Sequence, residues 1–405
     1  MKTLKNEKNK IGVSELLCAL YICNVVIVTT INELFNVFVG RTSIDTLACI
    51  GVFAIMGVMS LKYMCANIYV EDFAFVAAFI IVYCVSYILF PSTHFYVYRD
   101  TAKILANTLL PYFMIKGIMD TDKFDRCFDY VSVISIACAA LLLLLKNMSK
   151  TIISDEMNIA YSFILSAVYM LYRWLENKKE WWRLAVFATG VITLFLTGTR
   201  GPFLCIVTFV VMYLAINNRK PSTLLIFVSA VVVFAVLYYS GTLTRWFEML
   251  KVVFERNGIH TRIIDMFLES DLTDDTTRSS IYSTVWKSIV GSPIYGNGIL
   301  GDRVVTQGIY RYETGTYSHN AIIELMCHFG IVGGLALIVL VTYVFVKGYK
   351  CAKTSSEKGM LTVLISVSVT QLMVSFSYLF SFRIFLAIGY AVVLIERQKY
   401  GKRKV

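Results

Sequence analysis

The sequence predicts an all-α fold, a polytopic membrane protein of about 12 transmembrane helices with one long external loop. Of the 405 residues, 57% are hydrophobic and only 16% are charged, whereas a soluble chain carries about 25% charged residues. The apolar residues gather in runs of roughly 18–22, the length that crosses a bilayer as a helix. A soluble enzyme, a disordered chain and a disulfide-stapled secreted module are therefore excluded.

The apolar runs are taken in order along the chain. The first follows a basic start that resembles a signal peptide. No small-residue cleavage site follows, and Glu15 and Asn24 interrupt the run, so we expect a retained first helix. The fifth, seventh, eighth and last runs are short for a span. The predicted spans are Ile11–Ile31, Ile44–Met64, Phe73–Phe90, Ala102–Met119, Tyr130–Leu145, Met157–Leu175, Leu184–Thr197, Pro202–Ile216, Thr223–Tyr239, Ala321–Val346, Gly359–Phe380 and Arg383–Ile395.

The positions of Lys and Arg predict the orientation of these spans. With the N-terminus inside, cytoplasmic pieces hold 23 of the 38 basic residues and the short external loops hold 7, as the positive-inside rule requires. Both termini are then cytoplasmic. We expect one integral membrane domain, in which residues 1–239 form about nine spans, 240–318 form an external loop that carries the chemistry, and 319–405 form about three spans and a cytoplasmic tail.

The net charge of +11 does not indicate nucleic acid, because the basic residues lie in short connections between spans. Membrane lipids are the expected partners of such a chain. The ten cysteines are scattered, without a CxxC pair, so neither a disulfide framework nor a zinc site is expected.

Two amphipathic helices are predicted in the external loop. From Leu243 to Phe254, apolar residues recur at helical spacing with charged residues off that face, which suits a helix in the membrane interface. A second helix is predicted from Arg278 to about Val290, and Gly291 with Pro293 ends it.

Three external residues could carry chemistry. Arg200 lies in a tight turn whose Pro202 suits the first turn of the next helix. Arg278 lies in the first turn of the second loop helix, and a guanidinium at a helix N-terminus suits an oxyanion. His319 directly precedes the tenth span, and its imidazole can act as a general base near neutral pH. Taken singly, the alternatives are a lipid-headgroup anchor, a solvated loop Arg and an interfacial His without a chemical role. Taken together, the three describe a diphosphate site beside a proton acceptor.

Glu324 and His328 lie one helical turn apart inside the tenth span. A carboxylate within a span needs a partner, so Glu324 orients a neighbouring Arg or His or makes a purely structural pair. His328 lies deeper, and we expect it to act through packing. No acidic cluster with the spacing of metal ligands is found, so neither a metal nor a cofactor is expected.

Several short motifs occur in a fixed order. GTRGPFL contains Arg200, R-x7-W runs from Arg278 to Trp286, and SPIYGNGI starts at Ser292; HN-x3-E-x5-G starts at His319. In order and spacing these motifs resemble the O-antigen ligase and polymerase superfamily, which comprises WaaL-type ligases and Wzy-type polysaccharide polymerases. The resemblance covers residues 196–334, about a third of the chain.

The resemblance implies a metal-independent glycosyltransferase of the GT-C type at the outer face of the bacterial plasma membrane. Its donor and acceptor would be undecaprenyl-diphosphate-linked oligosaccharides. Arg200 and Arg278 would hold the diphosphate and His319 would deprotonate the attacking hydroxyl. Asn320, Glu324 and Trp286 would complete the substrate site.

Length and the divergent first half favour a capsule, exopolysaccharide or O-antigen polymerase, with a chain-length regulator as a candidate partner. A ligase that transfers glycan to another acceptor is the alternative within the family. A lipid-linked oligosaccharide flippase is the alternative from another class, although the near absence of mid-span charges speaks against it. The sugars, their linkage, the stereochemistry and the oligomeric state stay open.

Overall fold

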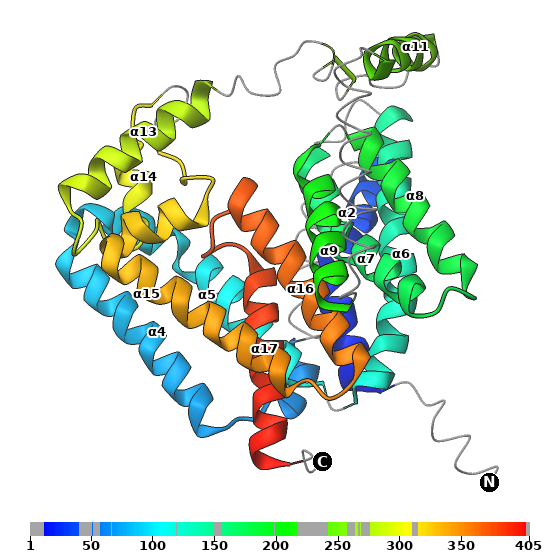
Figure 1. Ribbon diagram of the computed structural model, residues 1–405. Coiled ribbons are helices and arrows are strands. Elements are labelled where there is room, and N and C mark those ends of the chain that lie inside the picture. Colours follow the sequence, from blue (N-terminus) through cyan, green and yellow to red (C-terminus); the bar gives the residue numbers. More distant parts are fainter. Residues whose placement is uncertain are drawn as a thin grey trace. The chain divides into compact units, whose positions relative to one another are not determined.

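Every regular element among the described residues is a helix in this computed structural model (Figure 1). The helices are α2 (Val13–Val39), α4 (Val70–Leu89), η1 (Pro91–Thr93), α5 (His94–Lys116), α6 (Thr121–Met148), α7 (Glu156–Glu176), α8 (Trp181–Thr197), α9 (Gly201–Asn217), α11 (Thr242–Arg256), α13 (Thr276–Gly291), α14 (Gly301–Val305), α15 (Ala321–Cys351), α16 (Ser355–Val374) and α17 (Phe382–Tyr400). The structure describes residues 12–39, 51, 57–65, 67–118, 120–148, 156–197, 199–217, 242–256, 264–265, 268, 276–309 and 315–401.

The chain is a multi-pass membrane protein. Within the described ranges, five helices are long and apolar enough to cross a membrane, namely α4, α16 and the segments Val13–Phe35, Thr121–Leu145 and Ala321–Cys351. The shorter α8 and α9 are also apolar. The predicted span 223–239 lies outside the described residues, as does most of 44–64, so the count of about 12 stays a prediction.

The chain divides into two compact units. Unit 1 comprises Met1–Val58 and Asp122–Asp274, and unit 2 comprises Met59–Thr121 and Asp275–Val405. These are units of packing that interleave along the chain. The predicted division into 1–239, 240–318 and 319–405 concerns the membrane and stays a prediction.

Unit 1 is built around α7, which packs against α2, α8 and α9. Its middle turns, from Ile159 to Tyr172, are buried throughout. At one end, Arg183 Nη2 lies 2.6 Å from Asp129 Oδ2, and Arg173 Nε lies 3.2 Å from Asp129 Oδ1. Because a buried charge is costly unless it is paired, these contacts hold the ends of α6, α7 and α8 together.

Unit 2 is built around α17, which packs against α5, α15 and α16. Close approach depends on glycine here, because a Cβ on Gly389 would lie 2.8 Å from the Tyr112 carbonyl oxygen. Lys116 is fully buried, and its ammonium group donates to Asp72 and, over 2.6 Å, to Glu396. This ion pair ties α4, α5 and α17 together.

Helix α15 is broken at Gly330, whose φ of 71° and ψ of 175° are not helical. The turn 293–298 supplies the backbone groups that the break requires. Asn297 N donates to the Cys327 carbonyl (2.7 Å), Gly298 N donates to the His328 carbonyl (3.0 Å), and Ile331 N donates to the Pro293 carbonyl (2.7 Å). Irregular backbone in a spanning helix is tolerated where its polar groups find such partners. The break therefore fixes the turn 293–298 against α15.

The helix after α15 ends earlier than predicted. The sequence predicts a span over Gly359–Phe380, but α16 ends at Val374, and the chain then turns before α17. The prediction was wrong at this end because the apolar run continues past the helix. The backbone there makes hydrogen bonds outside a helix: Tyr378 N donates to the Glu324 carboxylate over 3.1 Å.

Both helices predicted within residues 240–318 are confirmed as α11 and α13. On α11, Trp246 and Val253 are more than half exposed, so its apolar side is open, and its place in the membrane interface stays a prediction. On α13, Ile281, Val285 and Ile289 are buried in one cluster with Cys327 of α15. Helix α13 is therefore docked on α15.

Candidate functional site

Arg278 and Trp286 both lie on α13. Arg278 is half-buried in the first turn, as predicted, and Trp286 lies two turns further and is 51% exposed. The buried stripe of α13 fixes this helix against α15, so the face that bears Trp286 stays open. The predicted roles of both residues, in holding a diphosphate and in binding substrate, are not tested by this placement.

Arg200 lies in the turn between α8 and α9. Helix α9 begins at Gly201, and Pro202 takes its first turn, as predicted from the sequence. Phe203 N donates to the Arg200 carbonyl (3.1 Å), which closes the turn. Arg200 is half-buried and belongs to unit 1, whereas Arg278 and His319 belong to unit 2. Whether Arg200 lies near the other two candidates is therefore a prediction.

His319 has an unusual backbone conformation. Its φ of 53° places a non-glycine residue in the left-handed region, which is sparsely populated and concentrates at functional sites. The next residue, Asn320, is the N-cap of α15, and its Oδ1 accepts from Ile322 N (3.0 Å) and Ile323 N (3.3 Å). The half-buried imidazole lies against Tyr317, with ring centroids 4.1 Å apart. Two anchored neighbours thus set the direction of this side chain.

The segment before His319 lies on α14. Thr306 Oγ1 donates to the Thr316 carbonyl (2.7 Å) and accepts from Thr316 N (2.8 Å). Gly315, with φ of 72°, passes so close that a Cβ would meet the Arg303 carbonyl oxygen. Asp302 Oδ2 accepts from Ser318 N (3.0 Å) and Ser318 Oγ (3.2 Å). The backbone that precedes His319 is therefore held by hydrogen bonds at Thr316 and at Ser318.

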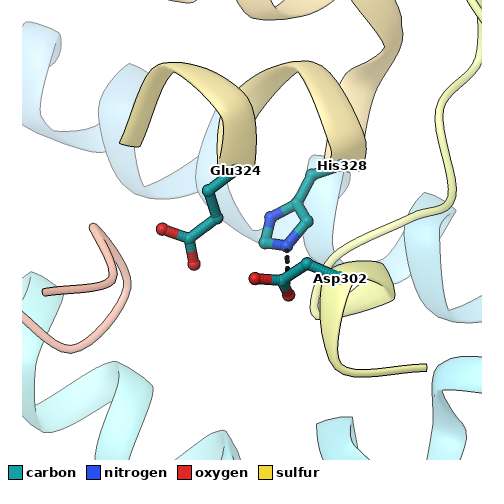
Figure 2. Close-up of side chains that lie close together, drawn as sticks. All are labelled: Asp302, Glu324 and His328. Atoms are coloured by element: carbon teal, nitrogen blue, oxygen red, sulfur yellow. Dashed lines mark hydrogen bonds and ion pairs between the residues drawn. The ribbon is translucent and has the colours of Figure 1, made fainter. Parts of the chain in front are cut away.

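Asp302 is fully buried and is the centre of a polar network. His328 Nε2 lies 3.0 Å from Asp302 Oδ1, and Figure 2 shows Glu324 and His328 pointing from α15 toward Asp302. Arg303 donates to the same oxygen from its backbone N and from Nη1, each over 3.0 Å. Burial by itself raises the pKa of Asp302, but the Arg303 guanidinium and His328 outweigh it and hold the pKa well below its ordinary value. Asp302 is therefore a carboxylate.

The charge on Asp302 determines which ring nitrogen of His328 carries a proton toward it. Because Asp302 can only accept, His328 Nε2 carries a proton. In the neutral ring, Nδ1 then accepts from the Tyr378 hydroxyl, 2.9 Å away. Three side chains from α14, α15 and the turn before α17 are joined in this way.

Glu324 has the partners that a carboxylate in a span was predicted to need. It is fully buried, its Oε1 accepts from the Ser377 hydroxyl, and its Oε2 accepts from Tyr378 N (3.1 Å). Arg303 Nη1 lies 3.9 Å from Oε1. These contacts give Glu324 a structural setting, and its predicted part in substrate binding is not tested by them.

Asp302, Glu324 and His328 also have the donor types of a metal site, since one ligand atom from each lies within 4.8 Å of the others. Arg303 Nη1 lies against both carboxylates, at 3.0 Å from Asp302 Oδ1 and 3.9 Å from Glu324 Oε1. A divalent cation would compete with this guanidinium for the same oxygens. The expectation that the protein uses no metal stays a prediction.

The sequence analysis missed Asp302, Arg303, Ser318 and Tyr378. The motif SPIYGNGI stops three residues before Asp302, and Ser318 directly precedes the motif that starts at His319. The available signal was an acidic and a basic residue, adjacent in sequence, within a glycine-rich stretch of a membrane protein. Such a pair has to be buried with partners or exposed, and the sequence does not distinguish the two.

Comparison with known proteins agrees with the motif resemblance. Residues 184–338, less than half of the chain, match a family model described as O-antigen ligase. The matched stretch contains all the predicted site residues: Arg200, Arg278, Trp286, His319, Asn320 and Glu324. No curated protein matches the chain. The resemblance is confirmed over residues 184–338, where the family match supports the O-antigen ligase and polymerase superfamily.

Proposed function

We propose that this protein is a polysaccharide polymerase that joins undecaprenyl-diphosphate-linked repeat units at the outer face of the bacterial plasma membrane, with both termini in the cytoplasm. The observation that carries the proposal is the family match, which contains Arg200, Arg278 and His319 in the expected order. The left-handed backbone of His319 at the start of α15 supports it, because strained backbone concentrates at functional sites.

The proposed reaction transfers a glycan from a lipid diphosphate to a sugar hydroxyl. The acceptor oxygen attacks the anomeric carbon, and the bond from that carbon to the phosphate oxygen breaks. Undecaprenyl diphosphate leaves with the bonding electrons, and His319 takes the proton of the attacking hydroxyl. Arg200 and Arg278 stabilise the charge that develops on the leaving diphosphate, because a guanidinium binds phosphate oxygens through two parallel hydrogen bonds.

A ligase is the second candidate, and the description of the matched family favours it. A ligase transfers the glycan to an acceptor that is not linked to undecaprenyl diphosphate. The chemistry at the donor is the same, so the acceptor alone distinguishes the two functions.

The test uses purified protein in liposomes with a radiolabelled, undecaprenyl-diphosphate-linked repeat unit. A polymerase forms a ladder of products from this substrate alone and releases undecaprenyl diphosphate. A product that forms only when an acceptor glycolipid is added supports the ligase. No glycan transfer under either condition contradicts both.

Arg-to-Lys variants test the diphosphate clamp in the same assay. Lys keeps the charge but loses the planar fork of Arg, so Arg200→Lys and Arg278→Lys should each lose most of the activity. Arg245→Lys, at an exposed position of α11, is the matched control and should keep it. Wild-type rates from both site variants would place the diphosphate elsewhere.

A further inference from the structure

We propose that Asp302 is a positioning residue that sets the backbone of His319. This rests on the proposed role of His319 as the general base. Asp302 reaches the backbone of His319 through Ser318, whose N and Oγ both donate to Asp302 Oδ2 at 3.0 and 3.2 Å. Ser318 is fully buried and its carbonyl carbon is bonded to His319 N. The position of the Ser318 peptide is therefore dictated by a buried carboxylate.

A second anchor lies on the other side of His319. Asn320 caps α15 with its side chain, so the residues before and after His319 are both fixed. The left-handed φ of 53° between them is uncommon for a residue other than glycine, and the two anchors hold it. When the Ser318 anchor is lost, His319 is free to relax to φ below zero, and its imidazole then points elsewhere.

Asp302 is itself held from the interior of α15. His328 Nε2 contacts Oδ1, and the Tyr378 hydroxyl contacts His328 Nδ1. The line of contacts therefore runs from Tyr378 through His328 and Asp302 to Ser318. Asp302 and Ser318 are 0% exposed and His328 is 1% exposed. Because water does not reach these groups, the loss of one of their hydrogen bonds is costly.

The contacts of Asp302 explain why an amide cannot replace it. Oδ1 accepts from Arg303 N, Arg303 Nη1 and His328 Nε2, and Oδ2 accepts from Ser318 N. Asparagine has one accepting oxygen and one NH₂ group. If the oxygen stays with Arg303 and His328, the NH₂ group faces the Ser318 N–H, and two donors then oppose each other. Asp302→Asn should therefore release Ser318 while it nearly preserves the side-chain volume.

The experiment compares Asp302→Asn, His319→Ala and the double variant, with Asp72→Asn as the matched control. Asp72 is also fully buried and paired in unit 2, with Lys116. Misplacement of a catalytic group by about 1 Å costs up to about 10²-fold in rate. We expect Asp302→Asn to lower kcat by about 10- to 100-fold on that basis, with KM for the donor little changed, and Asp72→Asn to lower thermal stability with kcat retained.

The double variant separates positioning from a structural effect. If Asp302 acts through His319, the double variant should be no slower than His319→Ala, because residues that act as a unit are not additive. If Asp302→Asn slows His319→Ala by the same factor as it slows the wild type, the proposal is overturned. A wild-type kcat in Asp302→Asn overturns it as well. His319→Ala alone tests the proposed function, so the two failures are distinguishable.

Tyr378→Phe keeps the test decisive if Asp302→Asn does not fold. It removes only the hydroxyl that holds His328. Tyr83→Phe is its control, because the Tyr83 hydroxyl makes a similar bond to Thr101 Oγ1, over 2.8 Å. We expect Tyr378→Phe to lower kcat by less than about 100-fold. Tyr83→Phe should leave kcat unchanged, and Tyr378→Phe should not slow the His319→Ala variant further. Equal kcat in Tyr378→Phe and Tyr83→Phe overturns the line of contacts.

Discussion

Substitution of Gly330 by alanine tests whether the break in α15 holds the turn 293–298 in place. At φ of 71° and ψ of 175°, a conformation essentially confined to glycine, an alanine pays about 1–3 kcal/mol. Its Cβ would also lie 2.4 Å from the Ile294 carbonyl oxygen and 2.6 Å from that of Pro293. Both are backbone atoms, so the turn 293–298 has to move.

The hydrogen bonds at the break set the rest of the cost. The three backbone bonds between the turn and residues 327–331 lie at 2.7–3.0 Å, and each contributes a net stabilisation of about 0.5–1.5 kcal/mol. Loss of one or two of them, added to the strain, gives about 1.5–6 kcal/mol for Gly330→Ala. Gly308→Ala is the control, because φ is 73° there but a Cβ meets nothing within 4 Å, so it reports the left-handed conformation alone, about 1–2 kcal/mol.

The assay is unfolding of the purified protein in mixed detergent micelles, with glycan transfer measured on the same samples. Gly330→Ala should lose more of the free energy of unfolding than Gly308→Ala loses, because it breaks backbone hydrogen bonds and adds a steric clash. It should also lose activity, because the turn leads into α14 and Asp302. Equal losses in the two variants would refute the reasoning that the turn is held by the break.

Three further predictions concern topology, metals and pH. Thr199→Cys and Ser283→Cys, in a background without native cysteines, should react with an impermeant thiol reagent in intact cells, and protection of both until lysis would contradict the external site. Glycan transfer should persist in excess EDTA, because two guanidiniums supply the charge at the diphosphate; activity that needs added magnesium or manganese would favour a metal at Asp302, Glu324 and His328. Because the folded pKa of Asp302 lies below its unfolded value of about 3.9, its contribution to stability is present above that pH and is lost as pH falls through the folded pKa. The difference in melting temperature between wild type and Asp302→Asn should therefore not close between pH 8 and pH 5, and closure in that range would contradict the assigned charge.

Local patterns in the sequence predicted much of the fold. Apolar runs gave the positions of most helices, Pro202 marked the start of α9, and the ends of α13 followed from its flanking residues. The start of α15 at Ala321 was predicted because the apolar run begins there. Each of these features depends on residues within a few positions of one another.

Contacts between distant residues could not be predicted in this way. Asp302 lies 16 positions before Ser318 and 26 before His328, and no periodicity relates such separations. The break at Gly330 is hidden for the same reason, since residues 293–298 supply the bonds that permit it. His328 was expected to act through packing, whereas the structure places it on the carboxylate that anchors the chain before His319.

The measurement that tests the central claim most directly is the rate of glycan transfer by His319→Ala, with donor binding measured on the same folded protein. General-base catalysis contributes about 10²- to 10⁴-fold, so the account predicts a loss of that size with donor affinity nearly unchanged. A variant of normal stability that transfers glycan at a rate near that of the wild type would contradict the account, because the proton would then leave the attacking hydroxyl by another route.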